Sequence, residues 1–99
     1  MKLENEFSPI RQWADDKGIL ENGDVKTQCL KLVEEVGELS KSILKGDNDE
    51  FIDAIGDCVI VLTNLAALNG LRIEYCINSA YSVIKNRTGK MANGTFIKD

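Results

Sequence analysis

Histidine is absent from the 99 residues of the chain. Its absence excludes serine and cysteine triads that use a histidine base, most zinc hydrolase sites, and the Glu-x-x-His pairs of di-iron helical bundles. Any chemistry that this chain performs therefore rests on carboxylates, lysines, arginines and amides.

Cysteine is scarce, and an uninterrupted long apolar stretch is missing. The three cysteines, Cys29, Cys58 and Cys76, form no CxxC pair and sit among apolar residues, which predicts buried free thiols. The start of the chain has charges where a signal peptide needs an apolar core. The longest apolar stretch, 58–68, is interrupted by two polar residues and is shorter than a bilayer requires. These features predict a soluble, cytoplasmic protein without a membrane partner.

Size and charge narrow the class further. A chain of 99 residues with 43% hydrophobic residues predicts one folded domain, 1–99. The net charge of −4 argues against a partner that is a nucleic-acid polymer, because such binders present a basic face to phosphates. A small phosphorylated ligand stays compatible if metal ions carry charge between protein and phosphate. A chain this short leaves much of its apolar surface exposed to solvent. We therefore expect oligomerisation to complete the fold.

The first half of the chain predicts two helices. Ser8 is expected to cap a helix over 8–17 that begins with Pro9, and a polar turn is expected over 21–24. A second helix is expected over 25–44 with Asp24 as its cap. Its apolar stripe contains Leu32, Val36, Leu39 and Ile43, and a polar sector with Glu35 and Glu38 borders that stripe.

The second half predicts two more helices and an extended end. A third helix is expected over 49–68; beyond Asp57 it is apolar nearly all round, which predicts burial on several sides. A fourth helix is expected over 72–86 with a polar stripe that includes Glu74, and an Asn-Gly turn predicts a hairpin or extended arm over 91–97. The fold class is therefore all-α: an antiparallel bundle of about four helices with a short extended C-terminal arm.

Two acidic clusters follow one another across a short break at 46–48. Glu34, Glu35 and Glu38 crowd into little more than one helical turn, where like charges repel. Two long helices joined by a short turn pack antiparallel, so we expect Glu35 and Glu38 to face Asp53 and Asp57. Inward carboxylates need a compensating cation, and oxygen ligands suit Mg²⁺. The alternative is a set of solvated surface charges.

Two motifs of these clusters resemble those of the all-α NTP pyrophosphatases, specifically the MazG-like branch: Gln28-x-x-Lys31-x-x-x-Glu35-x-x-Glu38-Leu and, after a turn, Asp53-Ala-Ile-Gly-Asp57. That family carries ExxE and then ExxD on two helices and binds Mg²⁺. The resemblance spans nearly the whole chain, including the region of Trp13 and the tail from Tyr81 to Phe96. It departs at Ala54, where the family pattern has a glutamate.

The resemblance implies Mg²⁺-dependent hydrolysis of an NTP or dNTP to the monophosphate and pyrophosphate, with Mn²⁺ as a possible substitute. Glu35, Glu38 and Asp57 match the metal ligands, and Asp53 is our substitute for the missing glutamate, with Glu50 as the alternative. We expect Glu34, Glu35 and Glu38 to be catalytic. Glu34 would orient or deprotonate the attacking water, although a solvated rim position is equally compatible with its place.

The remaining expectations concern the substrate and the assembly. Phosphate contacts are expected from basic residues with neutral neighbours: Lys31, Lys85, Arg87, Lys90, Asn78 and Tyr81. Trp13 is a candidate to stack on the base, although a lone tryptophan on an amphipathic helix is more often core, and Gln28 is a candidate to bind the sugar or base. A homodimer or homotetramer is expected. The competing functions are a non-catalytic nucleotide-binding module and a purely structural helical assembly.

Overall fold

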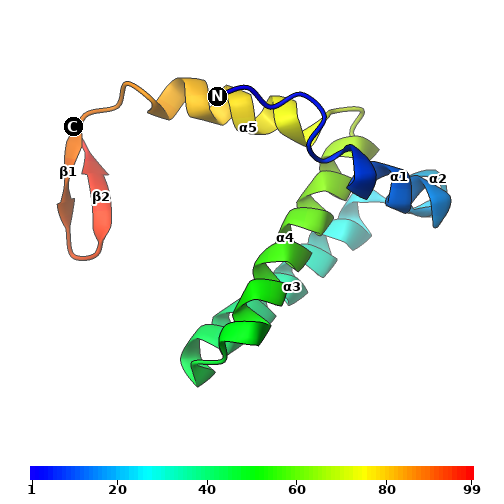
Figure 1. Ribbon diagram of the computed structural model, residues 1–99, viewed down its shortest axis with the longest axis horizontal. Helices are drawn as coiled ribbons and strands as arrows, with labels where there is room; N and C mark the ends of the chain where they lie inside the picture. The colour runs from blue at the N-terminus through cyan, green and yellow to red at the C-terminus, as the bar shows by residue number, and fades with distance from the viewer.

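Two 21-residue helices, α3 (Val25–Lys45) and α4 (Asn48–Leu68), form the body of the molecule in the computed structural model, which describes residues 1–99. They lie side by side and run antiparallel (Figure 1). Asp24 caps α3 by accepting the backbone N–H of Thr27, and Asp47 caps α4 in the same way through Glu50. These caps place both helices within one residue of the predicted bounds, which confirms this part of the prediction.

The N-terminal region contains two helices where one was predicted. Helix α1 spans Ser8–Asp16 and a single-turn helix, α2, spans Ile19–Asn22. Ser8 is the first helical residue and not the cap, which is Phe7, so the predicted cap was wrong. The predicted polar turn over 21–24 was also wrong in its first half, because Gly18 at φ 78° ends α1 and allows a new turn of helix to start.

The C-terminal third extends away from the α3–α4 pair. Helix α5 (Ile73–Ile84) leads to strands β1 (Gly89–Ala92) and β2 (Thr95–Lys98), which pair antiparallel as a hairpin at the far end of the molecule (Figure 1). The turn residues Asn93 and Gly94 both have positive φ, 52° and 81°, as a two-residue type I′ turn requires. The predicted hairpin is confirmed, and the fold is all-α with five helices and this short hairpin.

Glu74 fixes the start of α5 against the N-terminal region. Its side chain is 1% exposed and accepts two hydrogen bonds from the guanidinium of Arg11, one of them 2.8 Å from Nη2 to Oε2. The backbone N–H of Phe7 also donates to Oε2, and Arg72 lies 3.5 Å from the same oxygen. The bond to Arg11 lowers the pKa of Glu74 to about 2. The sequence placed Glu74 in the polar stripe of this helix, and the structure shows that it is buried at this position by its partners.

The apolar stripe predicted for α3 is only half covered. Leu32 and Leu39 are partly buried, whereas Val36 is 46% exposed and Ile43 is 59% exposed. The reason is that α3 turns Glu35 and Ser42, not Val36 and Ile43, toward α4. The prediction that α4 is buried on several sides beyond Asp57 is confirmed, because every residue of 58–68 except Leu62 is buried or partly buried. Before Asp57, the large apolar side chains of Phe51, Ile52 and Ile55 stay exposed.

Two expectations about burial and hydropathy change with the structure. All three cysteines are free, but Cys29 is exposed and the other two are only partly buried, so the prediction of buried thiols was wrong for Cys29. Helix α4 has a mean hydropathy of 1.8 over its most apolar window. By length and composition alone it would suffice to cross a membrane, a test that core helices of soluble proteins also pass. The prediction that no stretch is long enough was therefore wrong.

Candidate functional site

The facing sides of α3 and α4 carry the polar residues that the sequence singles out. On α3, Glu35 is 8% exposed and Ser42 is 1% exposed, spaced seven residues apart on one side of the helix. The buried residues of α4 include the small side chains of Ala54 and Ala66. Small side chains let two helices approach closely while leaving hollows beside the contact, and the acidic side chains lie at these hollows.

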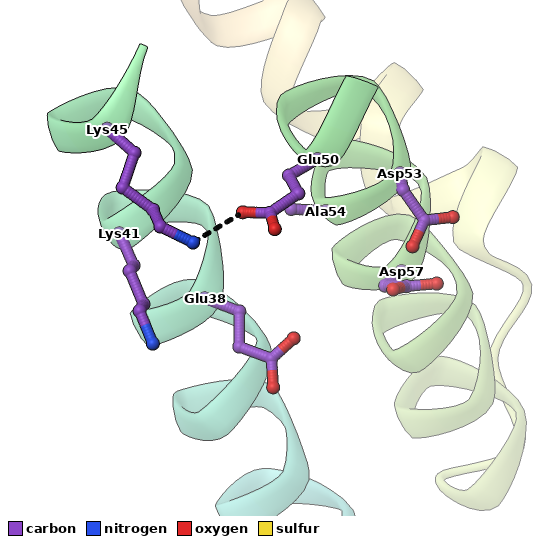
Figure 2. Close-up of a pocket in the computed structure, with 7 residues that line it drawn as sticks. All are labelled: Glu38, Lys41, Lys45, Glu50, Asp53, Ala54 and Asp57. Atoms are coloured by element: carbon purple, nitrogen blue, oxygen red, sulfur yellow. Dashed lines mark hydrogen bonds and ion pairs between the residues drawn. The ribbon is translucent and has the colours of Figure 1, made fainter. Parts of the chain in front are cut away.

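One cavity of about 400 Å³ lies between the lower halves of α3 and α4. It is lined by Glu38, Lys41 and Lys45 of α3 and by Glu50, Asp53, Ala54 and Asp57 of α4 (Figure 2). Glu38 points into the space between the helices, and Lys45 Nζ lies 3.5 Å from Glu50 Oε2. Predicted residues from both acidic clusters therefore meet in one cavity, as expected from the antiparallel packing.

Asp57 is the residue on which negative charge concentrates. Burial, the charge of Asp53 and the charge of Glu35 all raise the pKa of Asp57 above its ordinary value, and only Lys31 opposes them. Asp53 lies one turn earlier on α4, and its side chain is next to that of Asp57 (Figure 2). A position where several carboxylates destabilise one another's charge is a position that favours a cation.

A second cavity, about 420 Å³, adjoins the first and shares Asp57 with it. Its other polar lining residues are Thr27, Gln28, Lys31, Glu35 and Asn64, and its apolar wall includes Trp13, Ile19, Ile60 and Val61. Trp13 is 47% exposed, so the alternative that it is a core residue does not hold in this structure. The neighbouring hollow of about 300 Å³ is bordered by the same Trp13 with Pro9, Ile10 and Ile60.

Asn64 is a polar residue of this second cavity that we did not select from the sequence. It is 4% exposed, and its Oδ1 has no hydrogen-bond partner. A buried amide oxygen without a partner is costly and calls for a ligand or water. The signal was present in the sequence, because Asn64 falls on the same helical face as Asp53 and Asp57.

Lys31 is the cation closest to the acidic residues of α3. Its Nζ lies 3.2 Å from Glu35 Oε1 and 3.6 Å from Glu34 Oε1. These two glutamates raise the pKa of Lys31, the hydrogen bond to Glu35 contributing most. The side chain of Glu34 is 60% exposed, so Glu34 lies at the solvent edge while Glu35 lies inside.

The structure does not bring the other expected phosphate-binding residues to these cavities. Tyr81, Lys85, Arg87 and Lys90 line none of them and lie on the part of the chain that leads away from α3 and α4 (Figure 1). Asn78 lies on α5, where its Nδ2 donates to the backbone oxygen of Leu3 at 3.2 Å. The contacts predicted for these residues are therefore not made within a single chain.

The carboxylate oxygens of the cavity are of the type that binds a hard cation, but in this structure they are too far apart to coordinate one ion together. The cavity offers carboxylate oxygens, the ligands that Mg²⁺ prefers. No three histidine, cysteine, aspartate or glutamate side chains lie close enough together to form a group that holds a metal ion. Binding would therefore require the carboxylates to converge by side-chain rotation.

The fold and the cavities define an all-α protein with an acidic site between two antiparallel helices. The model of the MazG nucleotide pyrophosphohydrolase domain matches residues 24–91, and the chain belongs to this family. The matched segment contains α3, α4 and α5 and every acidic residue of the first cavity.

A phage protein is similar to the same part of the chain. It is described as an uncharacterized 18.2 kDa protein in the rep-hol intergenic region of Haemophilus phage HP1 (strain HP1c1). The two are 39% identical over 67 residues, which is 68% of this chain and 41% of the phage protein. The chain thus spans less than half the length of that relative. No solved structure matches this chain.

Proposed function

We propose that this chain hydrolyses a nucleoside triphosphate, NTP or dNTP, to the monophosphate and pyrophosphate in a Mg²⁺-dependent reaction. The observation that carries the proposal is the position of Asp57, which borders both the carboxylate cavity and the cavity with Trp13 and Asn64. One cavity suits a metal-bound triphosphate and the other suits a base. Membership of the MazG family supports the same reaction class.

Glu35, Glu38, Asp53 and Asp57 would hold the metal. When bound, Mg²⁺, or Mn²⁺ in its place, would neutralise charge on the triphosphate and lower the pKa of the attacking water. We assign the fourth metal-ligand position to Asp53 and not to Glu50 because Asp53 lies beside Asp57. The carboxylate of Glu50 instead forms an ion pair with Lys45, at 3.5 Å. Ala54, 6% exposed in the cavity wall, leaves open space where the family pattern has a glutamate.

The residues of α3 divide the remaining work. Glu34, at the solvent edge, orients or deprotonates the attacking water, with Glu35 and Glu38 as the inner catalytic carboxylates. Lys31 is held beside Glu34 and Glu35, so an approaching phosphate oxygen can replace one of these partners.

The second cavity accommodates the nucleoside. Trp13 offers an exposed ring face for stacking on a base, and Gln28 offers an amide at the cavity wall for sugar or base. Asn64 adds an unpaired Oδ1 that accepts a hydrogen bond from a base amino or imino group. This set of groups supports a nucleotide over inorganic triphosphate as the substrate.

The exposed apolar faces of α3 and α4 support a homodimer or homotetramer. Val36, Ile43, Ile52 and Ile55 are each more than 40% exposed, on the two helices that also carry the site. Large apolar side chains exposed on neighbouring helices are typical of an interface with another protein surface. A cytoplasmic location and a substrate other than a nucleic-acid polymer complete the proposal, since the cavity presents carboxylates that repel polymer phosphates.

A product analysis tests the reaction. The purified chain is incubated with Mg²⁺ and each of the common NTPs and dNTPs, and the products are separated by ion-exchange chromatography. We expect equal amounts of monophosphate and pyrophosphate from at least one nucleotide, and no turnover when Mg²⁺ is chelated. Well-folded protein that yields no product from any nucleotide would exclude the reaction.

A non-catalytic nucleotide-binding module is the second candidate. Ala54 favours it, because a site with one carboxylate fewer than the family pattern can bind a nucleotide without turning it over. Thermal stabilisation by nucleotide and Mg²⁺ without product formation would select this function. Absence of both stabilisation and product would leave a purely structural helical assembly.

A further inference from the structure

We propose that the basic C-terminal arm of one chain, residues 85–99, reaches the carboxylate cavity of a second copy and supplies its phosphate-binding cations. The inference rests on the proposed function, because it assigns the arm to the same triphosphate site. It makes each active site a composite of two chains.

Charge is the first observation. Residues 85–99 carry four basic side chains and one acidic one, a net charge of +3. Because the whole chain has a net charge of −4, residues 1–84 have a net charge of −7. The basic side chains are Lys85, Arg87, Lys90 and Lys98. The cavity walls concentrate the opposite sign in Glu38, Glu50, Asp53 and Asp57. The arm and the cavity are therefore complementary in charge.

The arm has no partner in its own chain. The β1–β2 hairpin contacts no helix, and every residue of 79–99 except Ala92 is exposed. Its large apolar side chains face solvent, with Met91 67%, Phe96 47% and Ile97 48% exposed. An isolated two-stranded hairpin is marginally stable in water. An apolar hairpin that is held by nothing in its own chain needs a surface elsewhere.

The start of α5 prevents the arm from returning to its own cavity. Glu74, through Arg11 and the backbone of Phe7, ties the first turn of α5 to the N-terminal region. From that anchor α5 runs away from the α3–α4 pair for about 18 Å before the arm begins (Figure 1). The carboxylate cavity lies near the turn that joins α3 and α4, at the opposite end of α4 from the start of α5.

A second copy of the chain offers the hairpin an apolar surface to cover and offers the basic arm a carboxylate cavity to enter. The exposed apolar side chains of α3 and α4, such as Ile43 and Ile52, lie on the same helices as Glu38 and Asp53. A hairpin that covers this apolar surface with Met91 and Phe96, which lie opposite each other on one face of the hairpin, carries its cations to the rim of the cavity. In a two-fold dimer the exchange is reciprocal, so both arms and both cavities are used.

Mixing two inactive variants tests the exchange. Glu38→Gln removes a carboxylate, and the double variant Arg87→Ala with Lys90→Ala removes arm cations; we expect each alone to lose at least about 10-fold in kcat/KM. Unfolding and refolding the two together should restore roughly a quarter of wild-type activity, because half of the dimers are mixed and each holds one intact site. The matched control mixes Glu38→Gln with Asp57→Asn, which should restore nothing.

Full activity in the arm variant, or no recovery in the first mixture, would overturn the proposal. Recovery in the control mixture would equally overturn it, because both of its lesions lie in one cluster. If wild-type protein hydrolyses no nucleotide, the proposed function fails separately, and a disulfide experiment still decides the place of the arm.

The disulfide experiment needs no activity. The three native cysteines are replaced by serine, and a chain with Lys90→Cys is mixed with a differently tagged chain with Lys41→Cys, a residue of the cavity wall. We expect a cross-link between the two chains under mild oxidation. The control pairs Lys90→Cys with Lys17→Cys, which lines no cavity. Equal or absent cross-linking in the two pairs would refute the arm exchange.

Discussion

Asp53 and Asp57 lie four residues apart on α4, and both line the carboxylate cavity. The sequence was sufficient to select them, because helical periodicity puts both on one face together with Glu50. It was also sufficient to pair them with Glu38, because a short turn imposes antiparallel packing on two long helices. The sequence prediction chose Asp53 with Glu50 as the alternative, and the ion pair of Glu50 with Lys45 supports that choice.

The assignment of Asp53 predicts how two substitutions compare. Asp57→Asn should lower kcat/KM at least about 100-fold, because it removes a ligand at the most negative position of the site. Asp53→Asn should lose activity to a similar degree, whereas Glu50→Gln should keep most of it. Steady-state kinetics with the preferred nucleotide measures all three. A fully active Asp53→Asn protein with an inactive Glu50→Gln protein would reverse the assignment.

Ala54 predicts a metal-dependent change in stability. Ala54→Glu places an extra carboxylate in the cavity wall, which should lower the free energy of unfolding by roughly 1–3 kcal/mol without Mg²⁺. Added Mg²⁺ should recover most of that loss, because the new carboxylate completes the ligand set. Thermal unfolding with and without Mg²⁺ measures the effect. Ala54→Gln is the uncharged control, and an equal Mg²⁺ response in both variants would contradict the prediction.

At the scale of elements, the long helices were predictable and the short ones were not. Asp24 and Asp47 precede long amphipathic stretches, so local signals define α3 and α4. Helix α2 has four residues between Gly18 and Gly23, too few for a periodic pattern. The position of α5 depends on Glu74 and Arg11, which are 63 residues apart in the sequence, and no local pattern pairs residues at that distance.

The Glu74 anchor predicts a pH-dependent stability. Its pKa of about 2 lies below the ordinary value of 4.5, so its stabilising contribution is complete above pH 4.5. That contribution is lost as the pH falls from 4.5 toward 2, where the carboxylate becomes protonated in the folded state. Glu74→Gln should lower stability at pH 7 by roughly 3 kcal/mol, because Arg11 then lacks its charged partner.

Chemical unfolding at a series of pH values measures this loss. The Glu74→Gln protein should show a flatter decline of stability between pH 4.5 and 2 than the wild-type protein. Glu21→Gln, an exposed substitution, serves as the control and should follow the wild-type curve. Parallel curves for wild type and Glu74→Gln would show that Glu74 does not carry the acid sensitivity.

At the scale of the whole molecule, the single chain leaves large apolar side chains exposed on α3, α4 and the hairpin. Its principal extents are 44 × 34 × 23 Å, and the C-terminal hairpin stands apart from the helices. The sequence predicted oligomerisation from chain length, but it could not say which surface stays open. The structure locates that surface on α3 and α4, because the polar residues Glu35 and Ser42 take the inner positions and leave Val36 and Ile43 outside.

The exposed apolar face predicts a specific disruption of assembly. Ile43→Glu places a charge on a side chain that is 59% exposed in the single chain, and in an assembled protein that charge would be buried without a partner. We expect the variant to sediment as a monomer at concentrations where the wild-type chain is a dimer or tetramer. Lys17→Glu, at an exposed residue that belongs to neither α3 nor α4, is the control and should leave the assembly intact. A monomeric wild-type chain would contradict the prediction.

The central claim is that the carboxylate cavity between α3 and α4 hydrolyses a nucleoside triphosphate to the monophosphate and pyrophosphate. The most direct measurement is phosphorus NMR of the products formed by the wild-type, Glu38→Gln and Glu21→Gln proteins with Mg²⁺ and the preferred nucleotide. The account predicts pyrophosphate and monophosphate from the wild-type and Glu21→Gln proteins and at least about 100-fold less from Glu38→Gln. The claim would be contradicted if the products were orthophosphate and a nucleoside diphosphate. An unchanged rate of hydrolysis by the Glu38→Gln protein would also contradict it.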